Sequence, residues 1–447
     1  MNRRQFFGGL AAVGLAAPLV SRAFGKAPAP ASDEFFIFVH GTGGWDVTLW
    51  ADPRNERKGI IDPASTLNTD AGPIRLWQDA PLDDDERTFK LVQPAGCKIP
   101  FGPGIGKLVE HADRLTVING LAMNTVSHPD GTVFSATGRH LVGGRVVASS
   151  IDTMIANELG RESTFPIVSV SFPSSFVGDG LDRRVVPLRV GSINAITRVL
   201  SRSDKWESTA DRDAVTALLS QEARDLAARS HRPEVLEGLA VQYDALRKML
   251  GGDVQQLFAP NALRTAQPGF DYKARFSGGQ AINAAFAVEA MKKNLVRCIG
   301  FSLGGFDTHR ENYRNQAAIQ QDVFDCIAQL LRALDGAPHP TRAGHKLSEH
   351  THILVMSEFC RTPQINVNGG RDHYPNNSAL VISPRFRGNT VFGKSDPEQL
   401  LPATAKTFAA GARPVAPPDV LATFLSAFGI EPGRYVRDGE VVSELLA

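Results

Sequence analysis

Acidic and imidazole side chains recur in three loops of the sequence, each close behind a short apolar run. One stretch contains Asp307 and His309, the next contains Glu358, and the third contains Asp372 and His373. Asp307 and His309 are two residues apart, so both side chains can reach one cation. Taken singly, each residue has an ordinary explanation, such as a helix cap or a surface ion pair. Their recurrence after successive apolar runs favours a metal site.

The donor set consists of carboxylates and imidazoles without thiolates, which suits Zn²⁺ or Mn²⁺. Ca²⁺ is a weaker candidate because this ion prefers oxygen ligands. A bound divalent ion stabilises negative charge that develops on a phosphoryl or sulfuryl oxygen. Arg361 or Arg371 can pair with the other oxygens of such an ester. His128 lies in the turn-forming stretch Ser-His-Pro-Asp-Gly and is a candidate for a further ligand or a general acid.

A different chemistry is suggested by residues 300–304, Gly-Phe-Ser-Leu-Gly, which match the nucleophile elbow of serine hydrolases. Residues 40–44, His-Gly-Thr-Gly-Gly, resemble an oxyanion loop. In α/β-hydrolases this loop lies roughly a hundred residues before the elbow, and a helix follows the serine directly. Here the separation is much longer, and the residues after Ser302 indicate another turn. A serine esterase that uses Ser302 is therefore the less favoured alternative.

Short apolar runs precede the acidic and imidazole side chains and are typical of buried strands. They comprise residues 34–39, 115–118, 167–170, 296–301 and 351–356. Helical patterns separate most of them, including residues 311–334, and a further helix is expected at 418–425. This alternation predicts an α/β fold with a mostly parallel central sheet and helices on both faces. Such folds place their chemistry at the carboxyl ends of the strands. Helical periodicity at about 195–251 predicts a helical insertion.

The composition is that of a globular chain. Of the 447 residues, 43% are hydrophobic and 21% are charged, and the formal net charge is +1. This charge gives no reason to expect nucleic acid or an anionic membrane as a partner. Four cysteines lack metal-type spacing, and we interpret them as buried free thiols, although an oxidising destination permits a disulfide. They are Cys97, Cys298, Cys326 and Cys360.

The N-terminal residues have the layout of a secretory signal. Arg3 and Arg4 precede an aromatic pair, an apolar stretch at 8–20, and a Pro/Ala-rich linker. The apolar stretch is too short to span a hydrocarbon layer of ~30 Å comfortably, which favours a cleaved signal over a stable membrane anchor. The arginine pair indicates the twin-arginine translocase as the export partner. We therefore predict a signal and linker at 1–31, an α/β domain at 32–447, and a periplasmic or extracellular location.

Three blocks of the sequence resemble the domain of unknown function 1501 family. They are residues 303–309, 356–363 and 368–374. The likeness extends to the glycine loop with Asp46, to Ser127 and His128, and to the twin-arginine signal. It spans nearly the whole chain after the signal. The resemblance implies an exported bacterial protein with an alkaline phosphatase-like fold, placed in the alkaline phosphatase and sulfatase superfamily.

The superfamily pattern implies a set of metal ligands in this chain. The positions are Asp46, Asp307 with His309, Glu358, and Asp372 with His373. Glu358 and Phe359 stand where the superfamily has Asp-His, so one of two metals is either missing or bound differently. In addition, the chain has no Ser or Thr at a clear nucleophile position after Asp46.

Two functions follow as hypotheses. The first is an exported metal-dependent hydrolase of phosphate or sulfate esters, which acts on a small anionic ester or on a sulfated or phosphorylated polymer. The second is a non-catalytic or accessory binding protein that keeps the fold. The Glu358 substitution and the missing nucleophile favour the second hypothesis.

Overall fold

The computed structural model describes residues 33–53, 91–178, 180–194, 209–229, 240 and 259–447. The signal and linker predicted at 1–31 lie outside these residues, so their prediction stands on the sequence alone. Most of the insertion predicted at 195–251 also lies outside them. Helix α4 (Thr209–Ala227) falls within that insertion.

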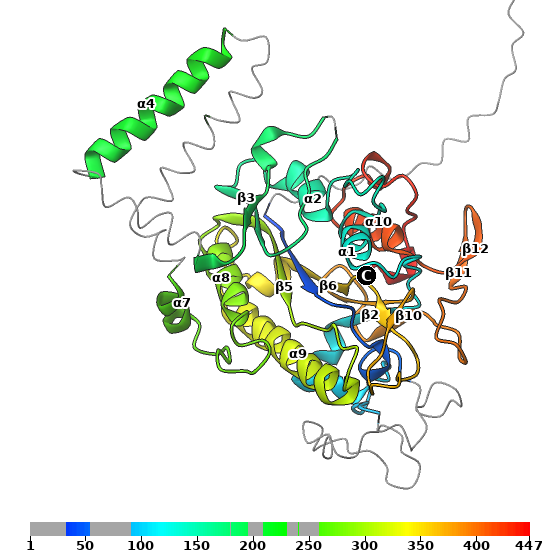
Figure 1. Ribbon diagram of the computed structural model, residues 1–447. Helices are drawn as coiled ribbons and strands as arrows, with labels where there is room; N and C mark the ends of the chain where they lie inside the picture. The colour runs from blue at the N-terminus through cyan, green and yellow to red at the C-terminus, as the bar shows by residue number, and fades with distance from the viewer. Residues whose placement is uncertain (1–32, 54–90, 179, 195–208, 230–239, 241–258) are drawn as a thin grey trace, which may run out of the picture.

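An eight-stranded sheet runs through the described part of the chain in the order β10-β2-β9-β6-β1-β5-β3-β4 (Figure 1). Its pairs are parallel except where β9 meets β2 and β6. The prediction of a mostly parallel sheet is therefore confirmed. The strands are β1 (Phe35–Gly41), β2 (Leu115–Asn119), β3 (Phe165–Val170), β4 (Leu188–Val190), β5 (Val296–Leu303), β6 (Thr351–Ser357), β9 (Ser378–Ile382) and β10 (Thr390–Gly393).

Strand β1 is central and pairs in parallel with both β5 and β6. All of its residues are buried. A strand that is covered on both faces needs no polar alternation, which explains the continuous apolar run in its sequence. Its register sets His40 between Ser302 of β5 and Met356 of β6, so the three strands end at the same edge of the sheet.

Helices cover both faces of the sheet (Figure 1), as predicted. Alternate β1 residues pack into two core layers. Phe35 and Ile37 belong to the layer with α8 and α9, and Phe36 and Phe38 belong to the layer with α1, α2 and α10. The helices predicted at 311–334 and 418–425 are confirmed as α9 and α10. The bounds are α1 (His128–Thr137), α2 (Ile151–Leu159), α8 (Ala281–Lys292), α9 (Asn312–Gly336) and α10 (Pro417–Ala427).

Shorter elements complete the described fold. Two small antiparallel sheets pair β7 with β8 and β11 with β12. The elements are β7 (Cys360–Arg361), β8 (His373–Tyr374), β11 (Lys406–Phe408), β12 (Gly411–Arg413), α7 (Pro260–Ala266), η1 (Val47–Leu49), η5 (Pro103–Arg114), η6 (Arg183–Val185), η8 (Leu347–His350), η9 (Pro432–Arg434) and η10 (Ser443–Leu445).

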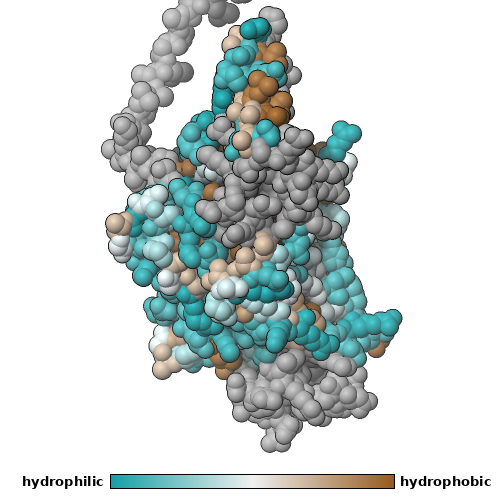
Figure 2. All heavy atoms as spheres, turned by 90° about the vertical axis from the view of Figure 1, so that its left-hand side faces the viewer, coloured by the Kyte–Doolittle hydropathy of each residue, from teal (hydrophilic) through white to brown (hydrophobic). Residues whose placement is uncertain are grey.

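Helix α4 differs from the other helices because large apolar side chains on it are exposed. Val215, Leu218 and Leu226 are 37%, 57% and 56% exposed, and Figure 2 shows hydrophobic surface on this helix. These residues belong to neither core layer. Among the described helices, none combines the length and the apolar character needed to cross a membrane.

The four cysteines all lie in the described residues and form no disulfide. Cys298, Cys326 and Cys360 are buried, and Cys97 is half-buried. Burial raises the pKa of the Cys298 thiol well above its usual value. The interpretation of the cysteines as free thiols is therefore confirmed, with Cys97 less buried than expected.

A buried carboxylate fixes the start of β1. Glu34 is 3% exposed and lies 2.8 Å from His352 Nε2, 3.2 Å from His350 Nδ1 and 2.9 Å from Arg385. Burial alone would raise the pKa of Glu34, but the hydrogen bond from His352 and the neighbouring charges outweigh it and lower the pKa to about 2. The ionised form of Glu34 therefore stabilises the folded chain.

We expect Glu34→Gln to reveal this contribution in the pH dependence of stability. A pKa lowered from 4.5 to about 2 corresponds to about 3 kcal/mol of folding free energy. That stability is present above the unfolded pKa of 4.5 and is lost as the pH falls through 2. Urea unfolding should therefore show Glu34→Gln to be about 3 kcal/mol less stable at pH 7, with a shrinking difference at pH 3. A constant difference at both pH values would contradict this account.

Candidate metal centre

The acidic and imidazole side chains meet at the carboxyl edge of the sheet. Asp307 and His309 follow β5, Glu358 follows β6, and His373 lies in β8. His128 begins α1, in the segment that follows β2. Strand β2 runs in the same direction as β6, because both are antiparallel to β9. Its carboxyl end therefore reaches the same edge and brings His128 to the predicted residues.

Three imidazoles converge on one carboxylate oxygen. Asp307 Oδ1 lies 3.1 Å from the Nε2 atom of His309, 3.6 Å from that of His128 and 3.8 Å from that of His373. The Nε2 atoms of His309 and His373 are 3.0 Å apart. Four possible ligand atoms from three separate segments thus lie close together, and those of His128, Asp307 and His373 all lie within 4.8 Å of one another.

The Nδ1 atom of each imidazole faces an oxygen acceptor. His309 Nδ1 lies 2.7 Å from Asp372 Oδ1, His128 Nδ1 lies 2.9 Å from Glu358 Oε1, and His373 Nδ1 lies 2.8 Å from the Val126 carbonyl. Carboxylates and carbonyls accept hydrogen bonds, so each Nδ1 carries a proton, and the rings of His309 and His373 in their neutral form keep a lone pair on Nε2. Metal-binding histidines in proteins have this arrangement.

The converging atoms fit a divalent cation. Lone pairs and a carboxylate oxygen 3.0 to 3.8 Å apart repel one another unless a proton or a cation lies between them. A tetrahedral zinc ion with ligands at about 2.0–2.1 Å places neighbouring ligand atoms ~3.3 Å apart, within that observed range. The side chain of Asp307 is 54% exposed, so the point of convergence is open to solvent.

Glu358 is the buried support for His128. Its side chain is 1% exposed, and its Oε1 atom also accepts a 2.7 Å hydrogen bond from the Gly43 amide. Burial would raise the pKa of Glu358, but the hydrogen bond from His128 and the nearby His40 ring hold the pKa below its usual value. The same hydrogen bond raises the pKa of His128. Glu358 therefore orients an imidazole and does not itself lie among the converging atoms.

Arg361 is buried beneath the site and fixes Asp307. Its NH2 group donates to Asp307 Oδ1 at 2.7 Å, and its Nε donates to the Gly44 carbonyl at 2.8 Å. It also donates to the carbonyls of Gly43 and Arg371. Burial would raise the pKa of Asp307, but the Arg361 hydrogen bond and charge outweigh it and lower the pKa. The guanidinium therefore positions a carboxylate and does not face the solvent.

Asp46 lies apart from the converging atoms. It is fully buried and caps η1 through the Thr48 amide at 3.0 Å. Its other oxygen accepts from Asn312 at 2.8 Å and lies 3.2 Å from Arg371. The structure thus brings Asp307, His309 and His373 together with His128. Asp372 and Glu358 each accept a hydrogen bond from one of these imidazoles. Asp46 and Arg371 belong to a separate buried network.

Two glycines that were not predicted as site residues permit this packing. Gly43 has a φ of 108°, and a Cβ there would lie 2.5 Å from the Asp307 amide nitrogen. A Cβ on Gly131, in α1, would lie 2.4 Å from the Glu358 carbonyl oxygen. Only glycine allows these close approaches. The sequence signals were the Gly-Thr-Gly-Gly loop and the glycine that follows the Ser-His-Pro-Asp stretch.

Ser302 does not form a nucleophile elbow. It lies inside β5, and its hydroxyl donates a 2.6 Å hydrogen bond to the Ser171 carbonyl. The following helix, α9, begins only at Asn312. An elbow needs a sharp turn from strand to helix at the serine itself. The geometry therefore disfavours the serine esterase.

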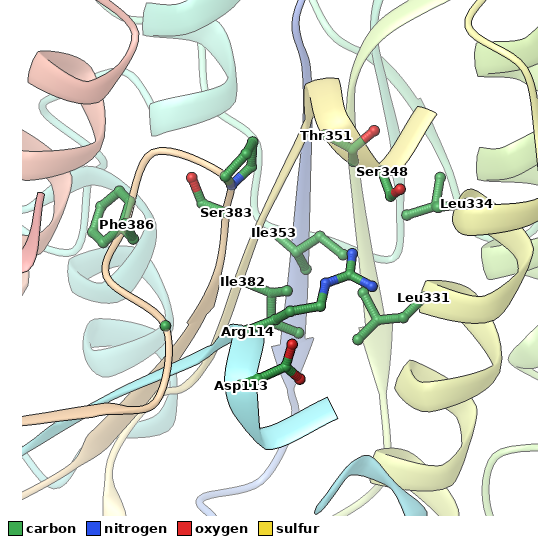
Figure 3. Close-up of a pocket in the computed structure, with 12 residues that line it drawn as sticks. Asp113, Arg114, Leu331, Leu334, Ser348, Thr351, Ile353, Ile382, Ser383 and Phe386 are labelled. Carbon is green, nitrogen blue, oxygen red and sulfur yellow. The ribbon is translucent and has the colours of Figure 1, made fainter. Parts of the chain in front are cut away.

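A separate cavity of about 210 Å³ lies at the opposite edge of the sheet (Figure 3). Its lining includes Thr351 and Ile353, at the start of β6. Figure 3 shows Arg114 beside Ile382 and Leu331. The cavity is smaller than typical ligand pockets, which measure roughly 300–1,000 Å³. It contributes nothing to the metal centre.

The fold and the site define an α/β protein with a carboxylate and imidazole centre at the carboxyl edge of its sheet. Residues 37–440 match the model of the family described as "Protein of unknown function (DUF1501)", so the chain belongs to this family. The resemblance seen in the sequence blocks is thereby confirmed. A search of curated proteins found no significant match.

Similar folds occur among solved structures. One is the crystal structure of Ps i-CgsB in complex with k-i-k-neocarrahexaose, with 12% identity, a TM-score of 0.39, and coverage of 91% of this chain and 74% of that chain. Another is the lipoteichoic acid synthase LtaP from Listeria monocytogenes, with 8% identity, a TM-score of 0.36, and coverage of 93% and 76%. At such low scores, these likenesses carry no information on what the chain binds or does.

We expect Arg361→Lys to destabilise the protein. A lysine has one ammonium group and cannot replace the guanidinium, which donates hydrogen bonds to three backbone carbonyls and to Asp307. The free energy of unfolding should fall by about 3 kcal/mol, because a buried charged network is broken. Chemical denaturation measures the change.

Arg332→Lys is the matched control. Arg332 forms a surface ion pair with Glu110 at 3.3 Å and is 44% exposed, so its replacement should cost less than about 1 kcal/mol. Equal losses for the two variants would contradict the role assigned to Arg361.

Proposed function

We propose that the protein is an exported metal-dependent hydrolase of phosphate or sulfate esters. The observation that carries the proposal is the convergence of Asp307 Oδ1 with the Nε2 atoms of His309 and His373. The neighbouring Nδ1 atoms are held by Asp372 and by the Val126 carbonyl. The donor set suits zinc or manganese, and calcium less well.

A divalent ion at this point supplies a Lewis acid that stabilises negative charge on an ester oxygen. Asp307, His309 and His373 would hold it, and three protein ligands are the number typical of catalytic zinc sites. Asp372 orients His309 through its 2.7 Å contact with Nδ1. Arg361 keeps the Asp307 carboxylate in place from below.

His128 is proposed as the general acid. Its Nε2 lies 3.6 Å from Asp307 Oδ1, near the converging atoms, while Nδ1 is fixed by Glu358. Hydrogen bonding to Glu358 raises the pKa of His128, which favours the protonated ring. A proton on Nε2 can then pass to the oxygen of the leaving alcohol. Glu358 thus acts through His128.

The substrate is proposed to be a small anionic ester or a sulfated or phosphorylated polymer. The exposed fractions of Asp307 and His309, 54% and 45%, leave room for a large molecule to approach. The net charge of +1 gives no support to nucleic acid as a substrate. Export by the twin-arginine translocase to the periplasm or beyond rests on the arginine pair of the N-terminal signal.

Metal content tests the proposed ligands. We expect the purified wild-type protein to contain zinc or manganese, and Asp307→Asn and His373→Ala each to hold one metal ion per chain fewer while remaining folded by circular dichroism. Asp438→Asn removes an exposed carboxylate, 70% accessible, and is the matched control that keeps its metal. Elemental analysis measures each. Unchanged metal in Asp307→Asn would show that the ligand assignment is wrong.

Turnover tests the proposed reaction. Across a panel of phosphate and sulfate esters, His128→Gln should keep its metal and lose about 10²-fold in kcat, as expected for a lost general acid. Ser302→Ala should retain full activity, since the Ser302 hydroxyl donates a hydrogen bond to the Ser171 carbonyl and is not among the proposed metal ligands. A metal-loaded wild type without turnover on any ester would overturn the hydrolase and support the accessory binding protein instead.

A further inference from the structure

A second cluster of metal-type ligands lies at the other edge of the sheet. Residues 337–350 connect α9 to β6, and an isolated bridge joins Pro338 to Lys346 within this connection. It carries His345, Glu349 and His350, the last two of them in η8. The whole length of β6 lies between the two sites, because this cluster precedes the strand and the candidate metal centre lies beyond its end.

The three side chains offer ligand atoms at close range. His345 Nδ1 lies 2.8 Å from Glu349 Oε2 and 3.0 Å from His350 Nε2. One ligand atom from each residue lies within 4.8 Å of the other two. The 2.8 and 3.0 Å separations are slightly shorter than the ~3.3 Å expected between neighbouring ligands of a tetrahedral zinc ion, so a small outward shift of the half-exposed His345 would admit the ion.

The cluster has a buried side that orients one ligand. The side chain of His350 is 7% exposed, and its Nδ1 atom lies 3.2 Å from Glu34 Oε1. Because an ionised carboxylate accepts, Nδ1 carries the proton and the Nε2 lone pair faces His345. Glu34 therefore supports His350 as Glu358 supports His128, through a carboxylate behind the imidazole.

Hydrogen bonds alone satisfy this cluster poorly. His345 Nδ1 has two acceptors nearby, Glu349 Oε2 and His350 Nε2, and one hydrogen cannot serve both well. The Lys346 amide also donates to Glu349 Oε2, at 3.2 Å. A cation at this point would instead accept a lone pair from all three side chains at once.

We propose that His345, Glu349 and His350 form a second, structural site for a divalent transition metal such as Zn²⁺. His345 and Glu349 are about half exposed, 50% and 51%, so the ion can enter from solvent and keep water at its remaining position. The ion would stabilise the connection between α9 and β6, which contacts Glu34 at the start of β1 through His350. This site does not depend on the proposed hydrolase function.

Zinc stoichiometry in four versions of the full chain tests the proposal. Each protein is stripped with a chelator, reloaded with Zn²⁺, desalted and measured by elemental analysis. We expect two zinc ions per chain in the wild type, one in His345→Ala, one in Asp307→Asn, and none in the double variant. Ser348→Ala, in the same 3₁₀ helix without a ligand atom, is the matched control and should keep two.

Hydrogen exchange distinguishes an ordered zinc site from nonspecific binding of zinc to the surface. Zinc should slow amide exchange in residues 338–347 of the wild type and of Asp307→Asn, but not of His345→Ala. One zinc ion per chain that persists in His345→Ala and disappears in Asp307→Asn would overturn the second site and leave the first intact. The reverse pattern would support the second site and contradict the proposed catalytic one.

Discussion

One buried guanidinium ties together the loops that carry the candidate metal centre. Arg361 donates to the carbonyls of Gly43, Gly44 and Arg371, and also to the carboxylate of Asp307. These partners come from the loop after β1, the loop after β5 and the segment that leads into β8. Without a charged donor, three carbonyls and a carboxylate would crowd together with nothing to offset their repulsion. The position of Asp307, and with it the point on which the imidazoles converge, therefore depends on a residue that never reaches the surface.

Carboxylates then decide which ring nitrogen of three imidazoles is free. Glu358 and Asp372 hold the Nδ1 atoms of His128 and His309 at the carboxyl edge of the sheet. At the opposite edge, Glu34 holds His350 in the same way. A carboxylate behind an imidazole fixes the tautomer and leaves the Nε2 lone pair for another partner. The same physical arrangement thus occurs at both edges of one sheet, once beside the exposed side chain of Asp307 and once beneath the connection between α9 and β6.

The sequence was most informative where burial dictates residue type. The apolar run before His40 predicted β1 because a strand covered on both faces carries no polar alternation, and α9 followed from its apolar stripe. Strand β9 was missed, since a short run such as 378–382 does not encode the antiparallel direction that it adopts. Asp307, His309 and His373 were predicted from their places after strands. The roles of Glu358 and Asp372 were not predicted, because sequence spacing cannot show which ring nitrogen a carboxylate faces. Asp46 was expected at the metal site, but in the structure it caps η1.

The most direct test of the central claim is a crystal structure of the zinc-loaded protein with anomalous data collected at the zinc absorption edge. The claim is that Asp307, His309 and His373 share one ion. The account predicts an anomalous peak at about 2.0–2.2 Å from Asp307 Oδ1 and from the Nε2 atoms of His309 and His373. Hydrogen-bonded imidazoles with no peak among them, in a protein that is fully loaded with zinc elsewhere, would contradict it.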